Sequence, residues 1–584
     1  MVQFNVDIPW EELSAPEQSE GYSALQPRSE VLVKGSCTEP GRLALPCDIL
    51  VEHDVAITVR DGCKLYADIY RPPGAADRTT PAILCWSPFG KKFNGVQSLK
   101  LMTPWNLGIP DGALSGLEKF EAPDPAEFVD NGYAIVNIDS RGAFDSEGRM
   151  AIMGTQEAED GYDVVEWLAK QDWCNGKVGM AGNSHLAIVQ WFVAALQPPS
   201  LKAIAPWEGC GDLYREQFAR GGIYGGDLFD HLIIKYMLRG RHGIESFRKM
   251  FEHHPGANDW WNDKRADMTK IDIPTYITGT YTNTMHGMGA IRGWLEVNSP
   301  DKWLRWHPYQ EWYDIWGNLE GRKELLSFFD RYLKDIDNGW ESTPRVRMSL
   351  LKFGEKAPIE NIIESDFPPP RTEYRKAYLT PDGLNFDKPA GPDSAVSYNS
   401  QDAEAGVTFK YTFPERTQIM GVPKAVLYMR CDDLDDMDVF LVLEKISSSG
   451  ERLLNLNIPW KNVPVSSIAE ISEKERTEVV LYQGPTGILR ASNRDIDSSR
   501  SIHPNWPFYT HEKEEKVAPG TVVRLEIGIW VMGVEYEAGE SIQLRIGGRY
   551  QGISNFGQDH TLNRGLHWVH MGGEYDSHLE LPFV

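Results

Sequence analysis

Short runs of apolar residues recur along the first half of the chain, with few polar positions inside them. They are AITVR (56–60), KLYADIYRP (64–72), AILCWSP (82–88), YAIVNID (133–139), KVGMAG (177–182), LKAIAP (201–206), PTYITG (274–279) and WLRW (303–306). Several lack the apolar–polar alternation of a strand with one face in water, and this pattern is typical of strands covered on both faces. We therefore predict a sheet that has helices packed on both sides.

The segment between two of these runs, EAEDGYDVVEWLAKQ (157–171), has helical periodicity. Its apolar positions Ala158, Tyr162, Val165 and Leu168 recur at intervals of three and four residues. Such intervals place the side chains on one face of an α-helix. Strand, helix and strand in succession predict a parallel sheet with right-handed crossovers.

Three segments depart from this rhythm. Residues 207–273 are too long for a crossover loop and rich in aromatic residues, and we predict a helical cap over the carboxyl edge of the sheet, with a peripheral helical decoration as the alternative. Residues 345–584 contain β-type runs between turn residues and predict an all-β sandwich, a jelly roll. Residues 1–51 are polar and Pro-rich and predict an N-terminal extension. The α/β domain would then comprise residues 52–206 and 274–344.

Composition narrows the partners and the compartment. The 584 residues carry a formal net charge of −25 and give a pI near 5.1. Such a surface repels nucleic acid and anionic membranes, so we expect neither as a partner. The seven cysteines form no CxxC pair, and the amino terminus has no basic region followed by an apolar stretch. We expect a cytoplasmic protein.

The candidate chemistry lies in GNSHLA (182–187), between the predicted strand KVGMA and the apolar run IVQWFVAAL. A serine flanked by small residues at a strand-to-helix turn is the nucleophile elbow of the α/β-hydrolase fold, which raises the hydroxyl above the sheet. The spacing G-x-S-x-x-A is looser than G-x-S-x-G, and a serine that only caps the helix is the alternative. The preceding strand and the following helix favour Ser184 as a nucleophile.

The order of residues along the chain predicts a partner for this serine. In the α/β-hydrolase fold an acid follows a late strand and a histidine follows the next strand. His307 stands at the end of WLRW, where that histidine belongs. It would accept the proton of Ser184 and later return it to the leaving group. A buried structural histidine is the alternative.

The acid position is altered. After PTYITG comes TYTNTMHGMG, without Asp or Glu until Glu296. Asn283 is the best candidate to orient the imidazole, and Thr282 is the second. An amide can hold the tautomer but cannot stabilise imidazolium by charge, and Asp→Asn in a serine triad costs about 10⁴ in kcat. Either Asn283 serves, or a carboxylate such as Glu311 or Asp314 arrives from elsewhere, or the reaction needs a weaker base.

Longer segments resemble the CocE/NonD hydrolases, the group of cocaine esterase and X-prolyl dipeptidyl peptidase. The resemblance covers about residues 52 to 584. It rests on VRDGCKLYADIYRP, PAILCWSPFGKK, IDSRGAFDSEG, EAEDGYDVVEWLAKQDWCNGKVGMAGNSHLAIVQW, LKAIAPWEGCGDLYRE, LRASNRDID, VAPGTVVRLEIGIW and AGESIQLRIGG, and WLRWHPYQEWYD is similar to the fungal branch. The resemblance implies an α/β-hydrolase domain, a helical cap and a carboxyl-terminal jelly roll, with the active site where the three meet. It also implies that the reaction needs no metal or organic cofactor.

The resemblance also implies roles for single residues. Ser184 would be the nucleophile, and the backbone N–H of His185 one oxyanion donor. His185 stands where the family usually has an aromatic residue, and its side chain is a candidate donor or proton relay. The family's other donor is a tyrosine in Pro-Tyr-Gly, where this chain has Phe89. Phe89 cannot donate, and loss of one oxyanion donor typically costs about 10²–10³ in kcat. The family's aspartate, in Gly-Trp-x-Asp, meets Gly279-Thr280-Tyr281-Thr282, so two supporting groups are changed.

We therefore expect a serine hydrolase that cleaves an ester, thioester or amide of a neutral or apolar small molecule through an acyl-enzyme on Ser184. Tyr281, Trp260 and Trp261 are candidate substrate contacts for a bulky natural product, and a small aromatic core inside the cap is the alternative. The altered support groups leave acyl transfer, cyclisation or a lyase step as a second hypothesis. A non-catalytic binding protein is the third. A homodimer formed through the jelly roll is a further expectation.

Overall fold

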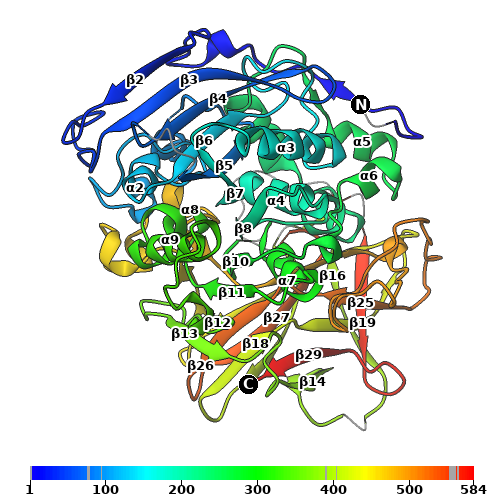
Figure 1. Ribbon diagram of the computed structural model, residues 1–584. Coiled ribbons are helices and arrows are strands. Elements are labelled where there is room, and N and C mark those ends of the chain that lie inside the picture. Colours follow the sequence, from blue (N-terminus) through cyan, green and yellow to red (C-terminus); the bar gives the residue numbers. More distant parts are fainter. Residues whose placement is uncertain are drawn as a thin grey trace.

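The computed structural model describes residues 3–74, 79–93, 95–283, 285–388, 391–402, 404–550, 561 and 565–584. An 11-stranded sheet in the order β13-β12-β11-β10-β8-β7-β5-β6-β4-β3-β2 forms the centre of its first half (Figure 1). The strands are β2 (Arg28–Leu32), β3 (Ile49–Thr58), β4 (Lys64–Arg71), β5 (Thr80–Ser87), β6 (Ala134–Asp139), β7 (Cys174–Asn183), β8 (Leu201–Trp207), β10 (Thr275–Thr280), β11 (Lys302–His307), β12 (Val346–Leu350) and β13 (Ile359–Glu364).

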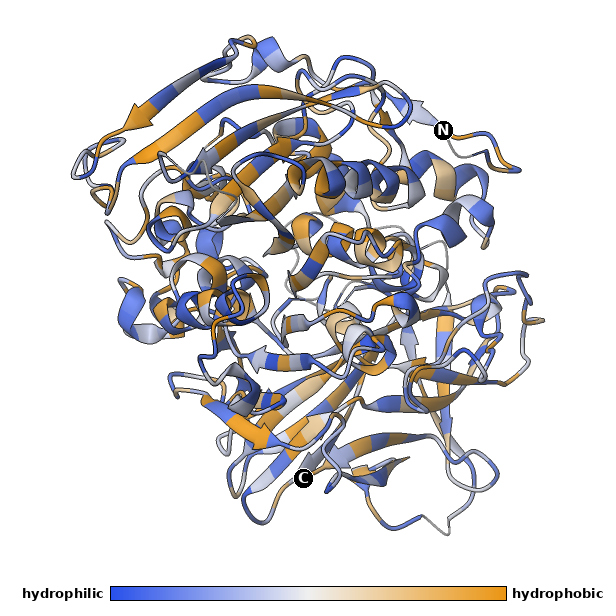
Figure 2. Cartoon of the chain, viewed as in Figure 1, coloured by the Kyte–Doolittle hydropathy of each residue, from blue (hydrophilic) through white to orange (hydrophobic). Residues whose placement is uncertain are grey.

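The middle of this sheet is parallel and its two edges are antiparallel. Strands β6, β5, β7, β8, β10, β11 and β12 run parallel to their neighbours, whereas β2, β3, β4 and β13 join antiparallel. Every residue of β5, β6 and β10 is buried. Figure 2 shows hydrophobic residues along the inner strands β5 and β6. The prediction of strands covered on both faces is confirmed, because a parallel sheet needs helices on both sides.

Helices cover both faces of the sheet. They are α1 (Gly95–Leu99), α2 (Pro125–Asp130), α3 (Thr155–Leu168), α4 (His185–Ala195), α7 (Gly287–Glu296), α8 (Glu311–Trp316) and α9 (Leu319–Leu333), with short turns η1 (Pro16–Gln18), η2 (Trp105–Gly108) and η7 (Trp340–Ser342). Helix α3 confirms the helix predicted from the periodicity of residues 157–171. Helix α4 is buried over residues 185–194 and begins directly after the candidate nucleophile. The end of β7 and the start of α4 therefore fix the position of Ser184.

The chain between β8 and β10 forms the cap. Its elements are η3 (Leu213–Phe218), η4 (Arg220–Gly222), η5 (Phe229–Met237), β9 (Ile244–Glu245), α5 (Phe247–His253), α6 (Asp259–Asp263) and η6 (Met268–Lys270). Aromatic rings pack inside it, and those of Phe218 and Phe247 stack at 4.1 Å. Strand β1 (Trp10–Glu11) pairs antiparallel with β9. Part of the N-terminal extension is thus hydrogen-bonded to the cap.

The C-terminal domain is an all-β sandwich. One sheet holds β14 (Glu373–Thr380), β15 (Gly383–Asn385), β16 (Ser394–Asn399), β18 (Thr417–Gly421), β19 (Lys424–Cys431), β25 (Val523–Gly528), β26 (Met532–Tyr536), β28 (Leu566–Met571) and β29 (His578–Phe583), and the other holds β17 (Val407–Thr412), β20 (Asp438–Ile446), β21 (Arg452–Leu453), β24 (Thr486–Arg490) and β27 (Ser541–Gly547). A small pair, β22 (Asn455–Leu456) with β23 (Leu481–Tyr482), and turns η8 (Trp460–Asn462), η9 (Ile468–Glu470), η10 (Glu473–Glu475) and η11 (Ala491–Asn493) complete it. The predicted fold class, an α/β hydrolase followed by an all-β domain, is confirmed.

Two element boundaries differ from those drawn on the sequence. Strand β3 begins at Ile49, so the limit placed between residues 51 and 52 crosses a strand. Strands β12 and β13 belong to the main sheet, although we assigned residues from 345 onward to the jelly roll. The reason is that β12 pairs parallel with β11, while Leu351 bridges to Val534 of the sandwich. The two domains thus share this stretch of chain.

Two findings bear on the compartment. All seven cysteines are free thiols. Every helix within the described ranges is too short or too polar to cross a lipid bilayer. The cytoplasmic location itself stays a prediction.

Candidate active site

Ser184 lies at the turn between β7 and α4 in a strained backbone conformation. Its φ is 54° and its ψ is −120°, which places a residue with a side chain in the left-handed region. A Cβ on Gly182 would lie 2.6 Å from Leu186 Cβ and 2.8 Å from the carbonyl oxygen of Glu121, so the turn needs a glycine there. This geometry is that of a nucleophile elbow, which presents the serine hydroxyl to the site above the sheet.

The histidine in contact with this serine is His286, at the start of α7. Its Nε2 lies 3.0 Å from Ser184 Oγ. Burial, with a smaller contribution from the charge of His185, lowers the pKa of His286 to about 3. The ring is therefore neutral at physiological pH and can accept the hydroxyl proton. Its buried Nδ1 has no hydrogen-bond partner in the described part of the chain, so no carboxylate orients this ring.

His307, the base predicted from the sequence, lies at the end of β11 and has other partners. Its Nε2 is 2.6 Å from Glu208 Oε1 and 3.5 Å from Asp314 Oδ2. Burial alone would raise the pKa of Asp314, but Arg305 and His307 lower it to about 2. The carbonyl oxygen of Glu208 accepts the N–H of Ser184, so the pair of His307 and Glu208 lies directly behind the elbow. A direct role of His307 as the base of Ser184 stays a prediction.

Asn283, predicted to orient the catalytic imidazole, has a different task in the structure. Its Oδ1 accepts the backbone N–H of Met285 at 2.9 Å and that of His286 at 3.2 Å. The carboxylates of Glu208 and Asp314 hold His307 instead. Of the alternatives drawn from the sequence, the carboxylate of Asp314 lies beside His307, whereas Glu208, which follows β8, was not among them. Asn283 shapes the loop that carries His286.

His286 was not among the candidate residues predicted from the sequence. It follows β10, in the segment where the family's acid would lie, and precedes the helix α7. A histidine directly after a late strand of this sheet was the available signal. The strand–loop–helix position, rather than the identity of the expected acid, would have selected it.

The predicted oxyanion donor is engaged by a carboxyl group. The N–H of His185 donates to Glu121 Oε2 at 3.2 Å, and Trp312 Nε1 lies 3.4 Å from Glu121 Oε1. Burial raises the pKa of Glu121 to about 8, although hydrogen bonds from Ser184, Trp312 and His185 oppose that shift. At neutral pH the group is therefore mostly a neutral carboxylic acid beside the nucleophile. The ring of Phe89 packs 5.9 Å from that of His185.

Two further carboxyl groups lie close to Glu121. Burial raises the pKa of Glu311, and the negative charges of Glu208 and Glu121 raise it further. Burial also raises the pKa of Glu208, which His307 partly offsets. None of the ion pairs formed by the described residues involves Glu121 or Glu311. We call Glu121, Glu208 and Glu311 the carboxyl cluster; nowhere in the described ranges do His, Cys, Asp and Glu side chains group in a way that could hold a metal ion.

The side chains predicted to touch the substrate are core residues. Tyr281 is fully buried, and its hydroxyl donates to the carbonyl oxygen of Ser349 at 2.8 Å. Trp260 and Trp261 are also buried, and Trp260 Nε1 donates to Glu245 Oε2 at 2.9 Å. These three residues pack the cap and the sheet, and none of them contacts a cavity at the active site. The alternative of an aromatic cap core therefore describes the tryptophans.

A cavity of about 500 Å³ opens beside the site where the three parts of the chain meet. Thr282, Asn283 and Met285, which lead to His286, form part of its wall. Its lining comprises Lys100, Leu101, Met102, Thr103, Pro104, Leu228, Thr282, Asn283, Met285, Gln310, Glu311, Trp312, Ser472, Lys474, Glu475, Thr477, Glu478 and Val479. The α/β domain, the cap and the jelly roll all contribute to it. We refer to it as the entrance cavity.

Known proteins with the same architecture match both halves of the chain. Residues 61–237 match the X-Pro dipeptidyl-peptidase (S15 family), and residues 338–580 match the X-Pro dipeptidyl-peptidase C-terminal non-catalytic domain. Cocaine esterase from Rhodococcus is 37% identical over 423 residues, which are 62% of this chain and 67% of that protein.

Solved structures agree. A CocE/NonD family hydrolase from Staphylococcus aureus superposes with a TM-score of 0.81 at 30% identity, covering 92% of this chain and 94% of that one. An α-amino acid ester hydrolase shares the fold, with a TM-score of 0.65 at 17% identity over 91% of this chain and 96% of that one. Together with the elbow at Ser184, these matches show that the chain is a serine hydrolase of the α/β-hydrolase type and belongs to the CocE/NonD family.

Proposed function

We propose that the protein cleaves an ester or thioester of a small molecule through an acyl-enzyme on Ser184, with His286 as the immediate base. The observation that carries this proposal is the 3.0 Å contact between Ser184 Oγ, on its strained turn, and Nε2 of a neutral imidazole. The entrance cavity has the volume of small-molecule sites, which are about 300–1,000 Å³.

The environment of His286 favours particular leaving groups. A base whose pKa is about 3 takes the proton of a serine hydroxyl weakly, whereas its protonated form is a strong acid toward the leaving group. Without a carboxylate at Nδ1, the imidazolium has little electrostatic support. This balance supports activated acyl groups, such as thioesters and aryl esters, over amides.

Glu121 supplies the group that the Phe89 substitution removes. Its carboxyl group accepts the N–H of His185. It thus occupies the position where the carbonyl oxygen of a bound substrate is expected. As a neutral acid it can donate an O–H to the oxyanion that develops during attack by Ser184. A substrate oxygen then shares the site with Glu121 and displaces it from His185. This assigns Glu121 the part that a tyrosine hydroxyl plays in the family.

The carboxyl cluster supports a second candidate function. Groups held protonated near neutral pH can shuttle protons, and buried acids with raised pKa values are typical of acid–base catalysis. A cyclisation or lyase step would use Glu121 as an acid and His286 or His307 as a base, without acylation of Ser184. The altered support groups fit this chemistry as well.

Labelling by a fluorophosphonate probe, followed by mass spectrometry of the modified peptide, separates the two candidates. The comparison needs wild type, Ser184→Ala, His286→Ala and His307→Ala, each checked for folding by its thermal midpoint. We expect the wild type and His307→Ala to label at Ser184, and His286→Ala to label much more slowly. A folded wild-type protein that stays unlabelled would reject the acyl-enzyme and favour the non-covalent reaction.

A further inference from the structure

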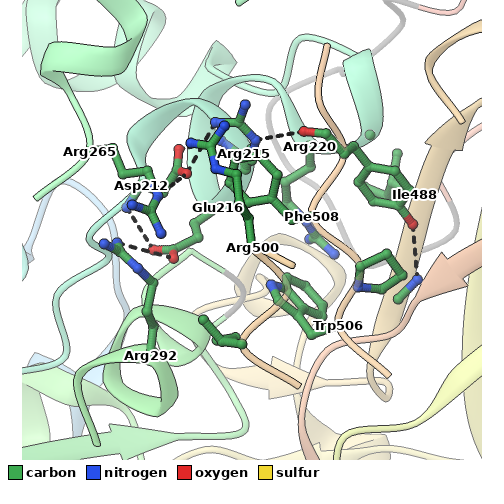
Figure 3. A pocket seen from close by; sticks show the side chains of 15 residues that line it. Asp212, Arg215, Glu216, Arg220, Arg265, Arg292, Ile488, Arg500, Trp506 and Phe508 are labelled. Atoms are coloured by element: carbon green, nitrogen blue, oxygen red, sulfur yellow. Dashed lines mark hydrogen bonds and ion pairs between the residues drawn. The ribbon is translucent and has the colours of Figure 1, made fainter. Parts of the chain in front are cut away.

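A second cavity, of about 40 Å³, lies between the cap and the jelly roll, and five arginine side chains surround it (Figure 3). The arginines are Arg215, Arg220, Arg265, Arg292 and Arg500, and the other lining residues include Asp212, Glu216, Ile488, Trp506 and Phe508. We call it the arginine cavity. Such a concentration of positive charge contrasts with a chain whose net charge is −25.

Three of these arginines are neutralised locally. Arg215 and Arg265 each lie 3.2 Å from the carboxylate of Asp212. Arg292 lies 3.0 Å from Glu296 and 3.9 Å from Glu216. In Figure 3 the side chains of Asp212 and Glu216 lie on the same side of the cavity as Arg265 and Arg292. That side therefore holds ion pairs that have no need of a ligand.

Arg220 and Arg500 form no ion pair with any carboxylate of the described chain. The Nη2 of Arg220 donates to the carbonyl oxygen of Thr486 at 3.1 Å, and its Nη1 lies 3.5 Å from the Thr486 hydroxyl. A guanidinium has five N–H donors, so most of the donors of Arg220 are left for another partner. The Arg500 guanidinium packs on the Phe508 ring at 3.9 Å. Arg500 is exposed, so Arg220 is the cation of this cavity that is left for an anionic group.

The geometry connects Arg220 to the active site. Arg220 and Ile488 also line a third cavity, of about 60 Å³, whose wall includes Met285, Leu228 and Glu478. Those last three residues line the entrance cavity too. Arg220 therefore lies at the inner end of a row of cavities that begins beside His286.

Trp530 gives a second connection. The Arg220 guanidinium lies 4.3 Å from the centre of a Trp530 ring. The Nε1 of the same indole would be 3.0 Å from a Cβ on Gly287, the residue after His286. One side chain therefore contacts both the guanidinium and the start of the helix that carries the base.

We propose that Arg220 binds a carboxylate group of the substrate while the ester is held at Ser184. This inference rests on the proposed esterase function and revises the expectation of a neutral substrate. Planar guanidinium donors match the two oxygens of a carboxylate, and burial makes such a pair stronger than in water. The substrate class is thus a hemi-ester or hemi-thioester of a dicarboxylic acid, or an ester that bears a separate acid group.

Matched chromogenic substrates test this specificity. One series is the p-nitrophenyl hemi-esters of dicarboxylic acids from succinate to suberate, and the other is the p-nitrophenyl esters of unbranched monocarboxylic acids of equal length. At one length we expect wild type to prefer the charged ester by 10-fold or more in kcat/KM. Arg220→Gln should lower kcat/KM about 10–100-fold for the charged esters alone, since a hydrogen bond to a charged group contributes about 1.5–3 kcal/mol. Arg220→Lys should restore part of it.

Two controls separate the ways in which this test can fail. Arg371 pairs with Glu364 at 2.7 Å, and neither residue lines any of the three cavities. Arg371→Gln should therefore leave kcat/KM for both substrate series unchanged. Fluorophosphonate labelling of Arg220→Gln reports on Ser184 alone. Normal labelling with no preference for charged esters in wild type overturns the role of Arg220 and leaves the esterase proposal intact.

Binding without turnover completes the test. In Ser184→Ala, monomethyl glutarate should raise the thermal midpoint more than methyl butyrate does, and Arg220→Gln should abolish the difference. This arm remains informative if wild type shows no esterase activity. If inorganic phosphate stabilises the protein as strongly as monomethyl glutarate, and hemi-esters are not preferred, the cavity takes a free anion and the substrate assignment is wrong.

Discussion

The carboxyl cluster is buried, whereas the arginines of the arginine cavity are, apart from Arg292, partly buried or exposed, and the two regions respond to desolvation in different ways. Burial raises the pKa of Glu121 to about 8, so this group becomes neutral by keeping a proton. Burial lowers the pKa of Arg220 only to about 10, so the guanidinium stays charged at neutral pH. A carboxyl group relieves its own desolvation by protonation, whereas a guanidinium needs an anion from outside.

This difference indicates which region does chemistry and which binds. The Glu121 carboxyl, whose pKa is raised to about 8, lies beside Ser184 and can give and take a proton during a reaction. A permanently charged guanidinium in a small cavity can hold an anionic group in place, but it transfers no proton. The first expectation for the molecule is therefore that substitutions near Ser184 change kcat, while those at the arginine cavity change specificity.

The largest loss of activity should come from replacing His286, the base beside the carboxyl cluster. His286→Ala should lower kcat/KM for a p-nitrophenyl ester by about 10²–10⁴, the usual contribution of a positioned general base. His307→Gln should cost less than 10-fold, because His307 contacts Glu208 and Asp314 rather than Ser184 Oγ. A reversed order of the two losses would return the role of base to His307.

Glu121 should give the next effect. Glu121→Ala should lower kcat by about 10²–10³, as loss of an oxyanion donor does. In wild type kcat should be level below pH 8 and fall about tenfold per unit above it, because only the protonated acid donates. Glu121→Gln keeps an N–H donor and should remove that alkaline fall. An unchanged pH profile in Glu121→Gln would exclude the neutral acid as donor.

The free energy of unfolding distinguishes an arginine that is paired with a carboxylate, Arg490, from one that is not, Arg220. Arg490 forms a buried pair with Asp438 at 2.7 Å, so Arg490→Met removes the guanidinium that compensates a buried carboxylate and should cost about 3–5 kcal/mol of unfolding free energy. Arg220→Met removes a partly buried cation that no carboxylate of the described chain neutralises, and it should be neutral or stabilising. Urea unfolding of both variants without ligand measures the difference. A large loss for Arg220→Met would reveal a structural role.

The pH dependence of stability should show the proton on Glu121. Its pKa in the folded protein is about 8, above its ordinary value of 4.5. The stabilisation is therefore full below pH 4.5 and is lost as the pH rises toward 8. The thermal midpoint of Glu121→Gln, compared with wild type, should rise across this window by a few degrees. If the thermal midpoints of Glu121→Gln and wild type differ by the same amount at pH 5 and at pH 8, the pKa of Glu121 is not raised in the folded protein.

Asn283 should give the smallest effect. Asn283→Ala removes the acceptor of two backbone N–H groups in the loop before His286 and should lower kcat about 3- to 10-fold, since each net hydrogen bond contributes about 1 kcal/mol. Asn283→Asp keeps the acceptor and should restore most of kcat. A failure of Asn283→Asp to restore kcat would point to the amide N–H₂ instead.

The sequence predicted the elements that follow from periodicity. The inner strands, the helix α3 and the elbow at Ser184 are local patterns, and the parallel sheet follows from their order. The membership of β12 in the main sheet was not predictable, because an isolated β-type run does not show which sheet it joins.

Contacts across the chain explain the errors at the site. Asn283 was assigned to His307 because the family's acid belongs near that position. In the structure Glu208, from the end of another strand, takes the place beside His307. Glu121, 63 positions before Ser184, approaches the elbow through a turn with a φ of 67°. Neither Glu208 nor Glu121 carries a sequence signal, since each acts through a neighbour that is distant along the chain.

The pairing of β1 with β9 has a mechanical consequence. Trp10 and Glu11 are bonded to Ile244 and Glu245 of the cap, and the N-terminal end lies beside α5 and α6 in Figure 1. The carbonyl oxygen of Pro9 also accepts the N–H of Ser246 at 2.8 Å. A pulling force applied at the N-terminal end would therefore reach the cap before the central sheet. The first rupture in an optical-trap trace should report release of the cap, at a lower force than unfolding of the sheet.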